Sequence, residues 1–279
     1  MPIQALLLSV AESDEDHASA ILWELDTLGV EVQTAAPGEA RLLAYFAADD
    51  GLLERLREAL SRLPGARAWP TPVPEVDWVA RFRETFRGFD VGVFHVAPPW
   101  DLPASLSPGQ RLILLDPGRA FGTGTHETTR LCLRALEQAF AAQPPQRVLD
   151  LGTGTGILAI ACALLGAREV TAIENDAEAL ASAREHAAKN GVHLDLRLGD
   201  CGRGLAAGAY DLVVANLTAP LLCERAGEIA RLARPAGRLV LSGLLAEEAP
   251  SVVAAYASFG TLTQAVDGDW ASLLLHIPV

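Results

Sequence analysis

Residues 1–69 alternate between apolar runs with a period of two and segments with apolar residues at helical spacing. The order of these patterns is β-α-β-β-α-β, which is typical of a ferredoxin-like α+β domain. Domains of this kind more often dock a partner than catalyse a reaction, so we expect a docking role. The predicted strands cover 3–10, 30–34, 41–46 and 66–69, and the predicted helices cover 18–28, ended by Gly29, and 52–63.

Residues 70–110 are predicted to form a linker that contains one helix. The Pro-Thr-Pro-Val-Pro run at its start is typical of a stiff, extended chain. Trp78, Phe82 and Phe86 then recur every fourth position and predict a helix with one aromatic stripe. We interpret this stripe as a packing seam rather than as a binding surface.

In residues 111–279, strands alternate with helices, which predicts a mostly parallel sheet covered on both faces. This α/β organisation is Rossmann-like and defines the second domain. The predicted strands are 111–115, a buried strand ending at 150, 170–174, 194–198, 210–216, 238–243, 261–266 and 270–277, and the predicted helices are 127–140, one after 150, 177–190, 219–233 and 246–258.

The composition fits two folded domains, since half of the 279 residues are hydrophobic. The net charge is −13, and residues 1–75 carry −8 of it, from 13 acidic and 5 basic residues. Such a field disfavours free nucleic acid and anionic membranes and attracts a basic partner, although solubility alone is the ordinary explanation. No apolar run approaches the roughly 18 residues of a spanning helix, and Met1 to Val10 lacks the basic region of a signal peptide, so we expect a cytosolic protein.

The cysteines and histidines show no metal-ligand spacing. No two cysteines form a C-x-x-C pair, and we interpret all four as small buried residues with free thiols. Of the six histidines, only His126 falls in a candidate site. The cysteines are Cys132, Cys162, Cys201 and Cys223.

A glycine-rich turn follows the strand that ends at Asp150 and precedes a helix. Gly152, Gly154 and Gly156 occupy alternate positions, where glycine allows a tight turn and a close approach of a ligand to the backbone. Glu174 ends the next strand, 22 positions after Gly152, near the place of a ribose-binding carboxylate. We therefore expect an adenosine-containing cofactor at the carboxyl edge of the sheet.

The spacing of these glycines, G-x-G-x-G, differs from the G-x-G-x-x-G of dinucleotide-binding proteins. The carboxylate of Asp150 would repel a pyrophosphate, but it suits a ligand with an amino group, such as the methionine end of S-adenosyl-L-methionine. Asp200 follows the next strand and could hydrogen-bond the adenine amino group, although a plain turn is equally compatible.

Residues 116–129 gather glycines and threonines around one aromatic residue, Phe121, before a predicted helix. Thr125 can cap this helix, and Thr128 or Thr129 can direct a hydroxyl at a ligand. Phe121 could cover an adenosine or wall off the reacting methyl group. We interpret the segment as a lid of the site rather than as a simple helix entry.

Asn216 ends a further strand at the same edge of the sheet. Its amide can accept a hydrogen bond from an incoming amine and can donate another. Enzymes that methylate a base nitrogen typically carry prolines and an aromatic residue here, and Asn216-Leu217-Thr218-Ala219 has neither. A turn-forming asparagine is the ordinary alternative.

Together these motifs resemble the PrmA family, the bacterial enzymes that trimethylate protein eleven of the large ribosomal subunit. The resemblance spans nearly the whole chain, and its most specific part is Phe-Gly-Thr-Gly-x-His-x-Thr-Thr at 121–129. The acidic strand end departs from the family's usual Asp-x-Asp-Pro, and Asn216-Leu217-Thr218-Ala219 departs from Asn-Ile-Leu-Ala. The matching segments are the Asp77-Trp78 helix, Ala97-Pro98-Pro99-Trp100, residues 120–129, the Asp150 loop, Val214-Ala215-Asn216-Leu217 and Asp269-Trp270.

The resemblance implies a class I S-adenosyl-L-methionine-dependent methyltransferase with a seven-stranded sheet over residues 111–279. It implies catalytic roles for Asn216 and His126, and a basic substrate, large-subunit ribosomal protein eleven, docked by residues 1–69. The acidic charge of that domain suits such a substrate. The cofactor set, with the residues singled out above, is Phe121, Thr129, Asp150, Gly152, Gly154, Glu174, Asp200 and Asn216.

The expected reaction is an in-line displacement on an already activated sulfonium, so the enzyme mainly aligns the amine. A lysine with a reference pKa of roughly 10.4 must first lose its proton, helped by desolvation or solvent, and no dedicated general base is evident. Asn216 would orient the nitrogen, and His126 could assist. The alternatives are a methyltransferase for another protein lysine and a non-catalytic cofactor-binding scaffold. A small-molecule methyltransferase would leave residues 1–75 without a role, and the glycine spacing disfavours a nicotinamide dehydrogenase.

Overall fold

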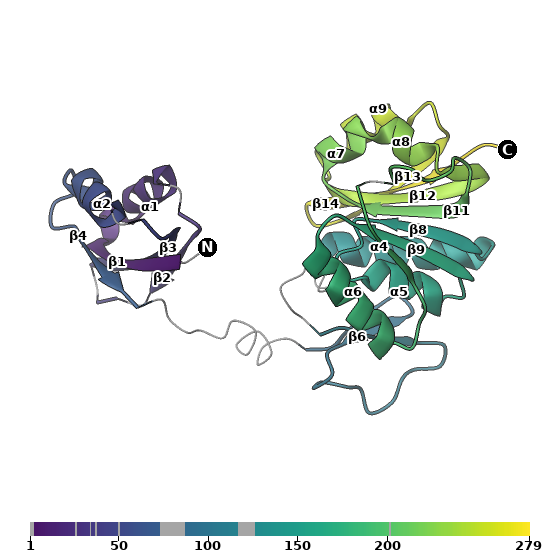
Figure 1. Cartoon of the computed structure of the whole chain (residues 1–279), viewed down its shortest axis with the longest axis horizontal. Helices are drawn as coiled ribbons and strands as arrows, with labels where there is room; N and C mark the ends of the chain where they lie inside the picture. The colour runs from purple at the N-terminus through teal and green to yellow at the C-terminus, as the bar shows by residue number, and fades with distance from the viewer. Residues whose placement is uncertain are drawn as a thin grey trace. The chain divides into compact units, whose positions relative to one another are not determined.

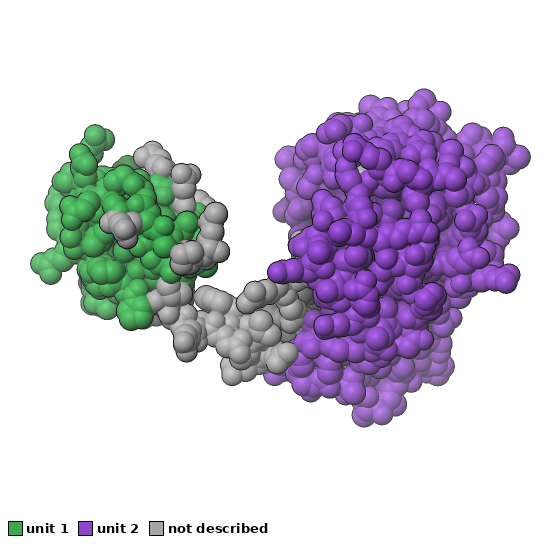
Figure 2. Space-filling model, in the orientation of Figure 1, with its two compact units in different colours: residues 1–77 green, residues 78–279 purple. Residues whose placement is uncertain are grey.

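The computed structural model describes residues 3–72, 87–116 and 126–279, apart from positions 26, 34, 37, 50 and 201. The chain divides into two compact units, residues 1–77 and residues 78–279 (Figure 2). The aromatic stripe predicted at Trp78, Phe82 and Phe86 lies outside the described residues. Within the described ranges, no helix combines the length and the apolarity needed to cross a lipid bilayer.

The N-terminal unit is a four-stranded sheet with two helices on one face (Figure 1). The strand order β2-β3-β1-β4, with every neighbouring pair antiparallel, is the ferredoxin-like arrangement that the sequence predicts. Leu6, Leu8 and Val10 alternate along β1 and are buried in the core with residues of both helices. The elements are β1 (Ile3–Ala11), η1 (Glu12–Asp14), α1 (Glu15–Glu24), β2 (Gly29–Gln33), β3 (Glu39–Ala47), α2 (Leu52–Leu60) and β4 (Arg67–Thr71).

The first helix ends four residues earlier than its apolar spacing predicts. It stops at Glu24, and Gly29 begins β2 instead of ending the helix. The hydroxyl of Thr27 lies 2.9 Å from the carbonyl oxygen of Tyr45 and 3.0 Å from that of Gly29. Such side-chain to backbone bonds compete with helix continuation. Leu28 is therefore exposed rather than part of a helical face.

Residues 87–116 form a small sheet, where the sequence predicts a linker up to residue 110. The strands are β5 (Phe89–Val91), β6 (Phe94–Ala97) and β7 (Arg111–Leu114). β6 pairs antiparallel with β5 and parallel with β7, so β7 belongs to this sheet and not to the large one. Strands of three or four residues contain too few alternations to stand out in a sequence.

The large sheet of the second unit has seven strands in the order β10-β9-β8-β11-β12-β14-β13. The first five strands of this order, from β10 through β9, β8 and β11 to β12, are mutually parallel. Strand β14 runs antiparallel to both of its neighbours, β12 and β13. The mostly parallel, seven-stranded prediction is confirmed. The strands are β8 (Arg147–Leu151), β9 (Glu169–Glu174), β10 (Asp195–Leu198), β11 (Tyr210–Asn216), β12 (Ala233–Leu245), β13 (Thr261–Asp267) and β14 (Trp270–His276).

Helices cover both faces of this sheet (Figure 1). Along β11, Leu212 and Val214 join the core under α4, α5 and α6, whereas Val213 and Ala215 join the core under α7, α8 and α9. A strand buried on both faces is apolar throughout, as its sequence is. The helices are α4 (Glu127–Ala142), α5 (Ile157–Leu164), α6 (Ala177–Lys189), α7 (Ala219–Glu224), α8 (Ala226–Ala230) and α9 (Ala249–Tyr256).

The segment 219–233, predicted as one helix, is divided into α7 and α8 at Arg225. The backbone of Arg225 leaves the helical region (φ −99°, ψ 12°), and its guanidinium binds the carboxylates of Glu228 and Asp200. Two of the predicted buried thiols, Cys132 and Cys162, lie in the core under α4 and α5. Burial raises the pKa of Cys132 to about 12, so this thiol stays protonated at neutral pH.

Candidate active site

Three of the predicted site residues meet at the carboxyl edge of the large sheet. Asp150 lies near the end of β8, and Glu174 and Asn216 are the last residues of β9 and β11, which flank β8. Parallel strands end at one edge, so the three side chains share it. The first turn of α4 comes to the same edge, because Nδ2 of Asn216 lies 3.5 Å from Oγ1 of Thr128.

Asp150 is the most deeply buried acid of this edge, with 1% of its surface exposed. Its Oδ2 accepts a hydrogen bond from the hydroxyl of Thr153 at 2.6 Å, and its Oδ1 is buried with no partner among the described residues. Burial raises the pKa of Asp150 to about 6, although hydrogen bonds from Thr153 and the backbone of Ala159 oppose the rise. The nearby carboxylate of Glu174 raises this pKa further.

The glycines of the loop after β8 are required by the backbone and by close packing. Gly152, Gly154 and Gly156 all have positive φ, at 69°, 55° and 83°. A Cβ at Gly152 would lie 2.7 Å from the side chain of Leu217, and one at Gly156 would lie 3.1 Å from Cβ of Ala183. The loop thus turns tightly between β8 and α5.

Glu174 holds this loop from the neighbouring strand. Its Oε2 accepts the backbone N–H of Gly154 at 2.8 Å, and its Oε1 accepts the N–H groups of Asn175 at 2.8 Å and Asp176 at 3.2 Å. These bonds fix the carboxylate beside the glycine loop, the position predicted for a ribose-binding acid. Oε2, which accepts one N–H, has a second lone pair that can accept from a ligand hydroxyl.

The first turn of α4 presents two buried threonines. His126, rather than the predicted Thr125, caps the helix, since its Nδ1 accepts the N–H of Thr128 at 3.3 Å. Thr125 itself lies outside the described residues. Thr128 and Thr129 are each 1% exposed, and Oγ1 of Thr129 has no partner in the described part of the chain. A capping histidine was not foreseen, because capping preferences favour short hydroxyl and carboxyl side chains.

A hydroxyl joins the two residues predicted to be catalytic. Oγ1 of Thr128 lies 2.9 Å from Nδ1 of His126 and accepts from Nδ2 of Asn216. Oδ1 of Asn216 is then buried without a partner among the described residues. The ring of His126 also packs edge-on against Trp270, with 4.6 Å between centroids.

Gly243 supports the end of β11, and sequence reasoning missed it. It lies where the pairing of β12 with β14 shifts register between Ser242 and Leu244, and its φ is 87°. A Cβ at Gly243 would overlap the carbonyl oxygen of Leu217 and lie 2.8 Å from its carbonyl carbon. A glycine inside a predicted strand was the only available signal.

One predicted cofactor residue, Asp200, is not joined to this cluster. Asp200 follows β10 and is exposed, and its carboxylate lies 3.3 Å from the guanidinium of Arg225. Its proposed bond to adenine stays a prediction. Phe121 lies outside the described residues.

Three buried oxygens without partners therefore converge on one edge of the sheet: Thr129 Oγ1, Asp150 Oδ1 and Asn216 Oδ1. Native structures rarely leave such atoms unsatisfied unless a ligand or water completes them. Two carbonyl-type acceptors and a hydroxyl suit a cofactor with a cationic amino group, and a buried carboxyl does not suit a pyrophosphate. The residues therefore fit S-adenosyl-L-methionine.

The fold and this site define a class I S-adenosyl-L-methionine-dependent methyltransferase. A family model described as ribosomal protein L11 methyltransferase (PrmA) matches residues 3–277. The chain belongs to this family, as the resemblance of its motifs predicts.

Individual relatives agree along most of the chain. A ribosomal protein L11 methyltransferase of Myxococcus xanthus is 35% identical, over 98% of this chain and 98% of its own length. One of Geobacter metallireducens is 40% identical, over 90% of this chain and 86% of its own length. A crystal structure of a ribosomal protein L11 methylase from Lactobacillus delbrueckii subsp. bulgaricus matches 70% of this chain and all of its own, at 30% identity and a TM-score of 0.64.

Proposed function

We propose that this protein transfers methyl groups from S-adenosyl-L-methionine to lysine side-chain or N-terminal amines of ribosomal protein L11. The observation that carries the proposal is the set of three unpartnered buried oxygens, on α4, β8 and β11, at the edge where the glycine loop turns. Membership of the family supports the choice of substrate. The reaction is placed in the cytoplasm, where ribosomal proteins are made and assembled.

The cofactor supplies the methyl group on a sulfonium, which is an activated leaving group. The work of the chain is to align an amine with it and to keep that amine neutral. Asn216 suits the first task, because its Nδ2 is turned to Thr128 and its Oδ1 can accept an N–H of the incoming amine. Burial of the site favours the neutral form of a lysine amine, which supports the second task.

His126 fits an orienting role better than that of a general base. Its Nδ1 accepts the backbone N–H of Thr128, so the proton of the neutral ring belongs on Nε2. A nitrogen that already carries a proton cannot take one from an amine. His126 would then act by fixing Thr128 and, through it, Asn216.

The N-terminal unit is proposed to dock the basic substrate through the face of its sheet opposite α1 and α2. Across this face runs a row of cross-strand partners from β2 to β4: Glu31, Leu43, Leu7 and Trp69. Leu7 and Trp69 are partly exposed and offer apolar contact area, Leu43 on the other side of Leu7 is buried, and Glu31 adds a carboxylate at one end. Such a surface complements a partner that carries both apolar and cationic side chains.

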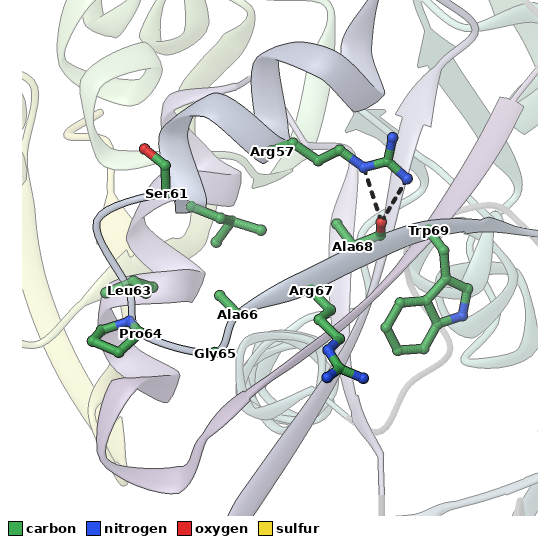
Figure 3. A pocket seen from close by; sticks show the side chains of 10 residues that line it. Arg57, Ser61, Leu63, Pro64, Gly65, Ala66, Arg67, Ala68 and Trp69 are labelled. Carbon is green, nitrogen blue, oxygen red and sulfur yellow. Dashed lines mark hydrogen bonds between the residues drawn. The ribbon is translucent and has the colours of Figure 1, made fainter.

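The β4 edge of the same unit, where the row ends at Trp69, is basic and is a less suitable docking surface. A groove of about 600 Å³ lies between the end of α2 and β4, and Arg57, Arg67 and Trp69 line it (Figure 3). Arg57 donates from Nε and Nη2 to the carbonyl oxygen of Ala68, at 3.3 and 3.2 Å. Its positive charge remains near the groove and would repel a basic protein.

The direct test is transfer of a labelled methyl group to free L11, assembled large ribosomal subunits and a cell lysate, assayed in parallel. We expect label on L11 and mass shifts that are multiples of one methyl group. Label on a different lysate protein would keep the chemistry and overturn the substrate. Cofactor binding without transfer to any of the three would favour a non-catalytic scaffold.

A further inference from the structure

Outside the cluster described above, a buried imidazole bridges the glycine loop and the end of β7. His186 lies on α6 and is 2% exposed. Its Nδ1 is 2.9 Å from the carbonyl oxygen of Thr155, in the glycine loop. Its Nε2 is 3.1 Å from both the backbone nitrogen and the carbonyl oxygen of Asp116, which lies two residues after the end of β7. The hydroxyl of Ser182 also lies 3.5 Å from Nδ1.

The partners of His186 assign its tautomer. The Thr155 carbonyl can only accept, so Nδ1 carries the proton and donates to it. The backbone N–H of Asp116 can only donate, so Nε2 is unprotonated and accepts from it. One neutral imidazole therefore satisfies two backbone groups from segments 39 positions apart.

Lys189, the last residue of α6, and Asn190, its C-cap, hold the same end of β7. The side-chain amide of Asn190 accepts the N–H of Leu114 and donates to its carbonyl oxygen, both at 2.8 Å, as a neighbouring strand would. Lys189 binds the carboxylate of Asp116 at 3.1 Å. His186, Lys189 and Asn190 stand at i, i+3 and i+4, on one side of the helix. The end of β7 is thus fixed to the C-terminal end of α6. Of the three residues that make these contacts, only His186 also contacts Thr155 in the glycine loop.

The glycine loop is in turn held from two directions. The carboxylate of Glu174 accepts a hydrogen bond from the N–H of Gly154, and Nδ1 of His186 donates one to the carbonyl oxygen of the next residue, Thr155. The first bond comes from the sheet and the second from α6. Removal of the second bond would take from the Thr155 carbonyl oxygen the donor that α6 supplies.

We propose that His186 is a positioning residue for methyl transfer, which sets the glycine loop against the end of β7. The glycine loop turns beside Asp150 and is held by Glu174, so its position against the end of β7 bears on where the cofactor lies. In-line transfer depends steeply on alignment, and a displacement of about 1 Å can cost hundredfold in rate. The inference rests on the proposed methyl transfer where kcat is measured, but not where the affinity for the cofactor is measured.

The test uses two variants that each keep one end of the bridge. The amide nitrogen of Asn in His186→Asn can occupy the place of Nδ1 and keep the bond to Thr155, while the bond to Asp116 is lost. The amide oxygen of Gln in His186→Gln can occupy the place of Nε2 and keep the bond to Asp116, while the bond to Thr155 is lost. Both variants keep a polar group in the buried position.

The expected results differ between the two variants. His186→Asn should bind S-adenosyl-L-methionine within about twofold of the unaltered protein and lose about tenfold in kcat. His186→Gln should lose about tenfold in affinity for the cofactor, because the loop loses its bond to α6. Arg238→Met is the matched control, since Arg238 bonds the carbonyl oxygens of Ala139 and Gln143 at the far end of α4. It should lower the thermal midpoint without changing kcat or the cofactor Kd.

Equal cofactor affinity of His186→Gln and the unaltered protein, by calorimetry on the full chain, would overturn the inference. The inference would also be overturned if kcat of both His186 variants fell no further than kcat of Arg238→Met, when proteins of equal thermal midpoint are compared. Failure of the proposed function has a different appearance, namely an unaltered protein that labels no substrate. The calorimetric comparison then decides the inference alone.

Discussion

Asn216 donates from Nδ2 to the hydroxyl of Thr128 across 3.5 Å, and its Oδ1 stays buried without a partner in the described part of the chain. The end of β11 and the start of α4 are thereby joined at the proposed position of the amine. The amide of Asn216 is held in one orientation by this bond, and its acceptor oxygen is left for a ligand.

Replacement of Asn216 tests this assignment. Asn216→Ala should lower kcat by about hundredfold, because the amine loses the acceptor that orients it, while the cofactor Kd changes by only a few-fold. Single-turnover methyl transfer and calorimetry measure the two quantities separately. A variant with full methyl transfer would remove Asn216 from the reaction.

Replacement of Thr128 tests the orientation of that amide. Thr128→Val keeps the shape of the side chain but cannot accept from Nδ2 of Asn216, so we expect kcat to fall by about tenfold. Thr128→Ser retains the hydroxyl and serves as the matched control, with kcat close to that of the unaltered protein. Equal rates for the valine and serine variants would show that the hydroxyl is dispensable.

The buried carboxyl of Asp150 should make the stability of the cofactor-free protein depend on pH. Burial raises its pKa to about 6 in the folded protein, against 3.8 ordinarily, so folding favours the neutral form. This contribution to stability is fully present below the unfolded pKa, roughly pH 4, and is lost as the pH rises through about 6. The loss amounts to at most about 3 kcal/mol.

Urea unfolding at pH 4.5 and pH 7.5, compared between the unaltered protein and Asp150→Asn, measures this term. The difference in unfolding free energy between the two proteins should shift in favour of the variant at the higher pH. Other titrating groups, such as Asp195 and Asp211, are common to both proteins and cancel in the comparison. A difference that does not vary with pH would contradict the raised pKa.

Gly243 should be irreplaceable by even the smallest side chain. Gly243→Ala places a methyl group against the backbone of Leu217 and forces a positive φ, so it should destabilise the fold by about 3 kcal/mol and lower kcat. Gly166→Ala is the control, because Gly166 also has a positive φ, of 105°, but an added Cβ meets nothing within 4 Å. It should show the cost of strain alone, about 1–2 kcal/mol, with kcat unchanged.

The proposed docking face predicts an effect on substrate affinity alone. Glu31→Arg reverses the charge at the acidic end of the row across β2 to β4, so KM for L11 should rise roughly threefold or more, and less at high salt. The cofactor Kd and kcat should not change. Glu58→Arg makes the same charge change on the exposed surface of α2 and is the control. Equal KM values for the two variants would place the docking surface elsewhere.

The sequence predicted the order of nearly all elements, because both domains follow strong local patterns. Leu212 to Ala215 is apolar without interruption, and it forms the strand that is buried on both faces. The residues at strand ends, Asp150, Glu174 and Asn216, could be placed together because parallel strands end at one edge. For this reason the candidate site could be assembled from motifs alone.

Features that depend on distant partners could not be predicted. The need for glycine at Gly243 arises from the backbone of Leu217, which is close only in the folded sheet. The break at Arg225 accompanies its ion pair with Asp200, 25 residues away. Strands β5 and β6 are too short to show a period, and His126 caps α4 with a ring that sequence preferences do not favour.

The bond between Lys189 and Asp116 has a practical consequence, because Lys189 is the only lysine of the chain. Amine-directed reagents would modify one side chain and the N-terminus and nothing else. Reductive methylation with isotope-labelled formaldehyde would thus place a single NMR reporter at the junction of α6 and β7. In radioactive assays, any self-labelling of the enzyme on lysine would be confined to this one amine.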